Sequence, residues 1–219
     1  MHDIVISFDN GPDAATTPQV LDILARRDIR GIFCVLGERL ARPQLRRLAE
    51  RAHAEGHWIA NHTYTHSVPL GQIEDAERVR REIDLTQELV GELVHPEKLF
   101  RPFGGGGNLD ERLLNDAAVE HLVAGGYTVV TWNAVPGDWK DPHGWVPRAL
   151  EQVRAEDPAL LVLHDLPTGA MDHLEEFLDR ATEDGARFVQ ELPQSCIPIC
   201  RGEVRGPLEG IVSDAGSRA

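Results

Sequence analysis

Two polar residues at the end of an apolar segment are the first candidates for chemistry in this chain. Asp9 and Asn10 follow the apolar run at residues 4–8, in the stretch VISFDNGPD. A buried charge is costly unless it is paired, so a carboxylate between a buried-looking strand and a Gly-Pro turn is in an unusual place for a purely structural residue. The position indicates a functional carboxylate and raises the question of what Asn10 replaces.

Two histidines and three other polar residues follow later apolar segments in the same way. His62 and His66, in NHTYTH, are spaced i and i+4. On a helical turn this spacing places both rings on one face, where they can share a metal ion. Arg101 in RPFGGGG, Asp138 in GDW and His164 in LHD each stand close behind another apolar run. We therefore expect these side chains to converge on one site.

Such convergence requires the apolar runs to be neighbouring parallel strands. The pattern predicts strands at residues 4–8, 31–36, 57–61, 99–102, 127–133, 159–165 and 187–191. It predicts helices at residues 17–28, 42–56, 73–94, 109–126, 145–155 and 171–185. Regular alternation of strand and helix favours a parallel sheet covered by helices, here in a single barrel-like α/β domain. In such folds the carboxyl ends of the strands carry the chemistry.

The composition narrows the class of protein and of partner. The chain has 219 residues, of which 42% are hydrophobic and 26% charged, as in ordinary globular proteins. Its formal net charge of -14 repels phosphate backbones and anionic lipid, so we expect no nucleic-acid or membrane partner. No apolar run approaches membrane-spanning length, and the start MHDIVISF lacks the features of an export signal. With three cysteines, we expect a cytoplasmic protein with free thiols.

The motifs in their order resemble a known enzyme family. SFDNGP, HTYTH, FRPFGG, GDW and LVLHD are similar to the motifs of the NodB-homology polysaccharide deacetylases, carbohydrate esterase family 4. The resemblance extends from residue 4 to about residue 190. It implies a distorted (β/α)7 barrel that hydrolyses an N-acetyl group, commonly on amino sugars, with the help of a divalent metal.

The resemblance also implies roles for the catalytic residues. Asp9 matches the general base, and Arg101 matches the arginine that pairs with it. His164 matches the general acid, and Asp138 matches the aspartate that orients it. These roles suit amide hydrolysis, because Asp9 can take a proton from water while His164 protonates the departing amine.

The metal and substrate sites follow from the same resemblance. His62 and His66 match the two metal-binding histidines, and Asn10 stands where a ligand carboxylate is expected. The implied metal is divalent, with zinc favoured over cobalt, nickel or manganese, and it would acidify water and polarise the carbonyl. For the substrate, a backbone N–H near Phe103 or Gly104 would stabilise the oxyanion, and Trp139 would form a wall of the groove.

Three departures from the family pattern leave the substrate open. Asn10 is a weaker ligand than a carboxylate, RPFGGGG has lost a proline, and Val135 replaces an earlier aspartate of the GDW motif. Without an export signal, a small soluble amide such as a chito-oligosaccharide is easier to reconcile than a cell-wall polymer. Two alternatives remain: hydrolysis of a non-sugar C–N bond, such as an N-formyl amine, cyclic imide or ureide, and a metal-free carbohydrate-binding pseudoenzyme.

The chain is expected to divide unequally. Residues 1–195 form the predicted NodB-like deacetylase domain, and residues 196–219 form a C-terminal tail. We expect this tail to pack on the barrel or on a neighbouring subunit, which agrees with a homo-oligomer.

Overall fold

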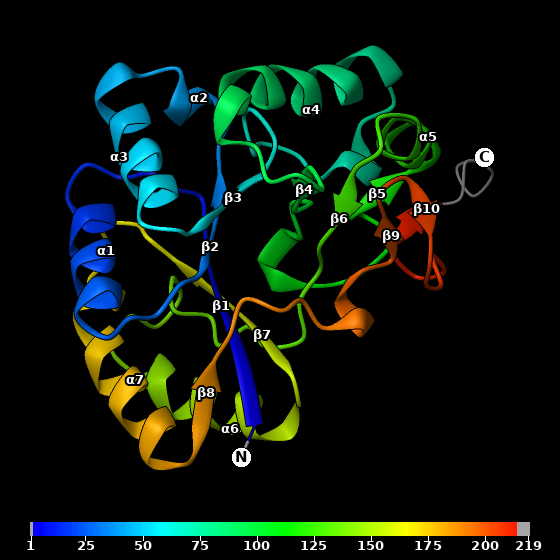
Figure 1. Ribbon diagram of the computed structural model, residues 1–219. Helices are drawn as coiled ribbons and strands as arrows, with labels where there is room; N and C mark the ends of the chain where they lie inside the picture. The colour runs from blue at the N-terminus through cyan, green and yellow to red at the C-terminus, as the bar shows by residue number, and fades with distance from the viewer. Residues whose placement is uncertain (1, 214–219) are drawn as a thin grey trace.

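The computed structural model describes residues 2–213, in which strands and helices alternate (Figure 1). The strands are β1 (His2–Asp9), β2 (Ile32–Val35), β3 (Trp58–Asn61), β4 (Leu99–Phe100), β5 (Leu114–Asn115), β6 (Thr128–Val129), β7 (Ala159–His164), β8 (Ala186–Phe188), β9 (Ile199–Cys200), β10 (Glu203–Val204) and β11 (Val212–Ser213). The α-helices are α1 (Thr16–Arg26), α2 (Gly37–Leu40), α3 (Pro43–Ala54), α4 (Ala76–Val90), α5 (Asp116–Ala124), α6 (Trp145–Ala155) and α7 (Leu174–Glu183).

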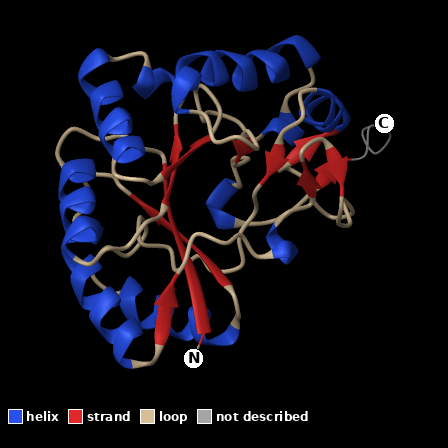
Figure 2. Cartoon of the chain, in the orientation of Figure 1, coloured by secondary structure: helices blue, strands red, loops and turns tan. Residues whose placement is uncertain are grey.

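The main sheet is curled and mostly parallel. Its order is β10-β9-β6-β4-β3-β2-β1-β7, and β8 pairs with the first residues of β1. A bridge between Ala134 and Leu161 returns the segment after β6 to β7, which brings the two sides of the sheet together. Figures 1 and 2 show the helices around the outside of the strands. The structure thus confirms the predicted α/β fold, a single distorted barrel.

Side chains alternate between the two faces of β1 and β7, as the strand period of two requires. Phe8 packs in a hydrophobic cluster with residues of α1, α6 and α7. Val5 packs in a second cluster, together with Val162 of β7. Asp9 therefore shares the face of Val5, and His164 shares the face of Val162. The alternation places the two candidate catalytic groups on the same side of adjacent strands.

The helix predicted at residues 109–126 begins later than expected, at Asp116. The side chain of Asn115 accepts a hydrogen bond of 2.9 Å from the backbone N–H of Ala118, which caps the helix. Asn115 also belongs to β5, which pairs with β11 from the far end of the chain.

None of the helices within residues 2–213 has both the length and the apolar character that a membrane span requires.

The strand predicted at residues 127–133 is limited to β6. The backbone N–H of Val130 still donates to the carbonyl of Phe100 of β4. That of Thr131 donates to the carbonyl of Cys196 at 2.8 Å, so the pairing changes partner directly after β6. Because Cys196 lies far along the chain, the residues of this strand contain no local pattern that would predict the pairing.

The C-terminal segment contributes three short strands. β9 pairs antiparallel with β6, β10 pairs with β9, and β11 runs parallel to β5. The last part of the predicted tail, residues 214–219, lies outside the described residues. The division of the chain at residue 195 and the homo-oligomer stay predictions.

Candidate active site

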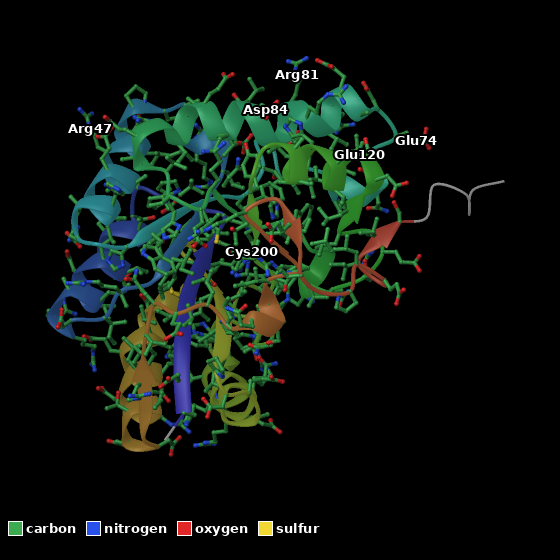
Figure 3. The ribbon with its side chains drawn as sticks, turned by 45° about the vertical axis from the view of Figure 1, so that its right-hand side comes forward. Arg47, Glu74, Arg81, Asp84, Glu120 and Cys200 are labelled. Carbon is green, nitrogen blue, oxygen red and sulfur yellow. The ribbon has the colours of Figure 1, made fainter. Side chains whose placement is uncertain are left out.

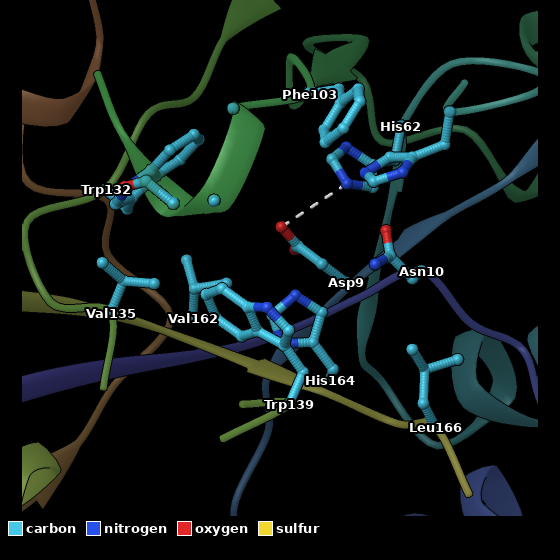
Figure 4. Close-up of a pocket in the computed structure, with 14 residues that line it drawn as sticks. Asp9, Asn10, His62, Phe103, Trp132, Val135, Trp139, Val162, His164 and Leu166 are labelled. Atoms are coloured by element: carbon cyan, nitrogen blue, oxygen red, sulfur yellow. Dashed lines mark hydrogen bonds and ion pairs between the residues drawn. The ribbon is translucent and has the colours of Figure 1, made fainter. Parts of the chain in front are cut away.

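A pocket of about 310 Å³ opens at the carboxyl ends of the strands (Figure 4). It is lined by Asp9, Asn10, His62, His66, Phe103, Gly104, Gly106, Gly107, Trp132, Val135, Trp139, Val162, His164 and Leu166. Strand register explains the convergence, because Asp9 of β1 is the direct partner of His164 of β7. In the same way Asn61 pairs with Phe100, and the residues that follow them are His62 and Arg101.

Asp9 and Arg101 form a buried ion pair. The guanidinium Nη1 of Arg101 lies 3.2 Å and 3.3 Å from the two carboxylate oxygens of Asp9, and the Arg101 side chain is fully buried. The guanidinium is held in place by the carbonyl of Val130, to which its Nε donates at 2.8 Å. Burial raises the pKa of Asp9, but the charge of Arg101 and the nearby histidines outweigh it, and the pKa is lowered. The carboxylate therefore stays ionised at neutral pH.

His62 presents one ring nitrogen to Asp9. Its Nδ1 donates to the carbonyl oxygen of Arg101 over 2.7 Å, which leaves Nε2 without a proton in the neutral ring. Nε2 lies 3.6 Å from Oδ2 of Asp9, as the dashed line in Figure 4 marks. Burial lowers the pKa of His62 and lowers that of His66 to about 3. Both rings are thus neutral, the form that binds metal ions.

The prediction that the two histidines share a helical turn is wrong. Residues 62–66 form an irregular loop after β3. Thr63 and His66 adopt left-handed backbone angles, with φ of 69° and 52°. The loop nevertheless brings the two rings together, with their centroids 4.8 Å apart. The contact that the spacing suggested is therefore present, but a different backbone produces it.

Asn10 faces the pocket with an oxygen that lacks a hydrogen-bond partner. Its Oδ1 is buried and unpaired, and Figure 4 shows it on the side of the histidines. A buried amide oxygen is costly without a donor, and a cation would satisfy it. Within residues 2–213, no group of three or more His, Cys, Asp or Glu side chains is arranged to hold a metal. The residues present fit a divalent cation with two imidazole nitrogens and one weaker amide oxygen.

His164 and Asp138 form a second buried pair. Nδ1 of His164 lies 2.9 Å from Oδ1 of Asp138, and the backbone N–H of His164 donates to Oδ2 at 2.9 Å. Burial alone would lower the pKa of His164, but the hydrogen bond and charge of Asp138 outweigh it, and the pKa is raised. The Trp139 ring packs edge-on against the imidazole, with the ring centroids 4.6 Å apart. This arrangement keeps a proton available on a buried histidine.

Phe103 and Gly104 form the side of the pocket next to the histidines. The Phe103 ring lies against His66, with the ring centroids 3.6 Å apart. A Cβ at Gly104 would come within 2.5 Å of the Trp132 ring, so only glycine allows this approach. Trp132 also donates from its indole nitrogen to the carbonyl of Gly107 at 3.1 Å. The role of this turn in binding an oxyanion stays a prediction.

The pocket also has apolar lining residues, of which Val162 and Leu166 were not singled out from the sequence. Trp132, Val135 and Val162 lie on one side of the pocket, and Leu166 lies on the opposite side, beyond His164 (Figure 4). Val162 could have been found, because it stands two residues before His164 on the same strand face. Trp132 lies beyond the regular part of its strand, so alternation alone does not indicate which way it points.

Replacing Asp138 by asparagine is expected to shift the basic limb of the pH–rate profile to lower pH. A group that must be protonated loses its function as the pH rises through its pKa, and Asp138 raises that pKa in His164. The measurement is kcat as a function of pH for the wild type and the variant. An unchanged basic limb would contradict the assignment of His164 as the acid.

Comparisons with known proteins agree on one family. The family model described as "Polysaccharide deacetylase" matches residues 2–130. A peptidoglycan-N-acetylglucosamine deacetylase of Bacillus cereus is 31% identical over 196 residues, covering 85% of this chain and 84% of that protein. A chitooligosaccharide deacetylase of Rhizobium leguminosarum bv. phaseoli is 33% identical over 171 residues, covering 74% of this chain and 67% of that protein. Some curated relatives are longer, and the match spans only 37% of their length.

A solved structure shows the same fold with a metal bound. It is a family 4 acetyl xylan esterase from Clostridium thermocellum in complex with a cobalt ion, with a TM-score of 0.69 and 22% identity. The match covers 85% of this chain and 87% of the esterase. At this identity the likeness concerns the fold alone.

Proposed function

This chain belongs to the polysaccharide deacetylase family and is a deacetylase acting on carbon–nitrogen bonds, and we propose that its substrate is an N-acetylated amino sugar or short oligosaccharide. One observation carries the proposal. The Asp9–Arg101 pair and the Asp138–His164 pair meet in one pocket, on register partners of adjacent strands. A base that stays ionised and an acid that stays protonated are the two groups that amide hydrolysis needs.

In the proposed reaction, Asp9 accepts a proton from the attacking water. Arg101 keeps the carboxylate ionised and holds it facing His62. A divalent cation held by His62, His66 and Asn10 would supply a Lewis acid that acidifies water and polarises the acetyl carbonyl. We propose zinc as the metal, with cobalt, nickel or manganese as substitutes.

His164 completes the proposed reaction by protonating the departing amine. Asp138 holds the imidazole through Nδ1, which leaves Nε2 as the proton donor to the substrate. The turn at Phe103 and Gly104 would donate a backbone N–H to the oxyanion, and loss of such a donor typically costs about 3–4 kcal/mol. Trp139 restricts the imidazole from its other side and borders the sugar.

The residues that line the pocket favour an uncharged sugar as the substrate. Of the described residues that line the pocket, none is lysine or arginine. Trp132, Trp139 and Phe103 offer apolar faces against which the C–H groups of a sugar ring can pack. We therefore propose N-acetylglucosamine units rather than sugars that carry a carboxylate. A cytoplasmic location stays a prediction, which cell fractionation would check.

The test is a screen for acetate release with and without added zinc. It includes N-acetylglucosamine oligosaccharides, N-formyl amines and cyclic imides. We expect zinc-dependent acetate release from the oligosaccharides alone. Hydrolysis of a formyl amine or an imide, without acetate release from any N-acetyl sugar, would favour the non-sugar alternative and sink the proposal.

The likeness to deacetylases speaks against a metal-free pseudoenzyme, and the observation in its favour is Asn10, which stands where a ligand carboxylate is expected. In Asn10→Asp we expect the metal affinity to rise by about 10–100-fold or more. Changes to residues that only orient the metal ligands already alter the affinity by that factor, and Asn10 would be a ligand itself. The added negative charge should also raise the pKa of bound water, which moves the acidic limb of the pH–rate profile to higher pH. Metal titration and pH–rate profiles would be measured side by side. Unchanged metal affinity would show that position 10 does not contact the metal.

A further inference from the structure

The loop that carries the two histidines is irregular, and other elements of the fold hold it in place. Residues 62–66 follow β3 and belong to no helix or strand. Their backbone is bonded to the start of α2, where the carbonyls of Thr63 and Tyr64 accept from the N–H groups of residues 37 and 38 at 3.0 Å and 3.1 Å. Thr63 and His66, neither of them glycine, have φ of 69° and 52°. Such left-handed conformations persist only when the surroundings hold them in place. The position of the histidine rings therefore depends on residues outside the loop.

The side chain of Glu82, from the middle of α4, makes three hydrogen bonds to this loop. Its Oε2 accepts from the backbone N–H groups of Tyr64 at 3.0 Å and Thr65 at 2.8 Å. Its Oε1 accepts from the hydroxyl of Thr65 at 2.7 Å. One carboxylate thus holds two successive peptide units of the four that separate the histidines.

A second contact attaches the start of the same loop to α4. The side-chain oxygen of Asn61 accepts from the backbone N–H of Thr63 at 3.1 Å, and its amide nitrogen donates to the carbonyl of Ile83 at 2.9 Å. Asn61 is the last residue of β3, so this contact fixes where the loop leaves the strand. Glu82 reaches further along the loop, to Thr65, the residue that precedes His66.

Burying the carboxylate of Glu82 costs free energy, which is unusual for a residue that serves packing alone. Glu82 is 8% exposed, and the hydrogen bonds of its carboxylate in the described part of the chain go to uncharged groups of the loop. Its neighbour Arg81 projects outward from α4, as Figure 3 shows. A buried carboxylate without a cation is unfavourable unless its hydrogen bonds compensate, and here all three go to the histidine loop.

We propose that Glu82 is a positioning residue that sets the His62–His66 pair in its ligating arrangement. It touches neither substrate nor metal and acts through the backbone of Tyr64 and Thr65. The inference rests on the proposed metal-binding role of the two histidines. It predicts that disturbing Glu82 will loosen the loop and weaken metal binding without removing a ligand.

The first measurement follows the loop itself and needs no metal. Amide hydrogen exchange at Tyr64 and Thr65 would be recorded by NMR for the wild type, Glu82→Gln and Glu88→Gln. Glu88 is exposed on the same helix and provides the matched control. We expect exchange at both amides to be at least about tenfold faster in Glu82→Gln than in the other two proteins. Equal protection in all three proteins would overturn the inference.

The second measurement is the affinity of the metal-free proteins for Co²⁺, followed by its visible absorbance. Replacing groups that orient metal ligands typically costs about 10–100-fold in affinity, and we expect a loss of this size in Glu82→Gln but not in Glu88→Gln. If Glu82→Gln does not fold, Thr65→Val removes one of the three hydrogen bonds and should show a smaller loss. Wild-type affinity in a folded Glu82→Gln or Thr65→Val protein would overturn the inference.

Neither measurement depends on the substrate. A wild type that releases no acetate from any sugar, but whose Co²⁺ affinity falls on Glu82→Gln, would refute the proposed function and support the role of Glu82. Conversely, an active deacetylase with the same Co²⁺ affinity in both proteins would refute only the role of Glu82.

Discussion

Replacing Asp9 by asparagine is expected to lower kcat for hydrolysis of an N-acetyl sugar by about 10²–10⁴-fold. Asparagine has nearly the same shape as aspartate, but it cannot take up a proton from water. The measurement is acetate release at saturating substrate and metal. A rate near that of the wild type would show that another group acts as the base.

The same substitution is expected to destabilise the fold, and a second variant separates the two effects. Arg101 is fully buried, and removing its partner leaves an uncompensated charge, which costs about 3–5 kcal/mol. In Asp9→Asn/Arg101→Met the charge is removed as well. We expect denaturant unfolding to show recovered stability and acetate release to remain low. Recovery of activity together with stability would mean that Asp9 has a structural role only.

Replacing His164 by alanine is the second large effect, with an expected loss in kcat of about 10²–10⁴-fold on N-acetyl sugars. An amine is a poor leaving group until it is protonated, and His164 is the buried imidazole whose pKa Asp138 raises. The variant should also lose the basic limb of the pH–rate profile that the wild type shows.

An activated aryl acetate provides the control for His164. A phenolate can leave without a proton, so His164→Ala should retain most of its activity on this ester. Asp9→Asn should lose activity on the ester and the amide alike, because both need an activated water. Equal losses on ester and amide in His164→Ala would contradict the role of His164 as the general acid.

Much of the fold and most of the candidate site could be predicted from the sequence. The buried run before Asp9 and the run before His164 are strands whose side-chain alternation is a local property. Parallel strands bring their carboxyl ends to one edge, so residues placed directly after them meet in the structure, as Asp9 and His164 do across β1 and β7. These features needed only residue type, spacing and order.

Other features could not be predicted, because they depend on segments far apart in the chain. The spacing of His62 and His66 indicated a helical turn, whereas Glu82 of α4 holds an irregular loop in its place. Thr131 gives its N–H to Cys196 instead of to a neighbouring regular strand, which shortens β6.

The lining of the pocket shows most clearly what the sequence alone does not determine. Residue types, spacing and motif order indicated Asp9, Asn10 and the histidines as candidate site residues, because strand ends and the order of motifs can be read from the sequence. The position of Trp132 follows from its contact with Gly104 and its hydrogen bond to Gly107, more than twenty residues away. Such contacts form only when the sheet has curled, because close packing between distant segments is a property of the whole fold.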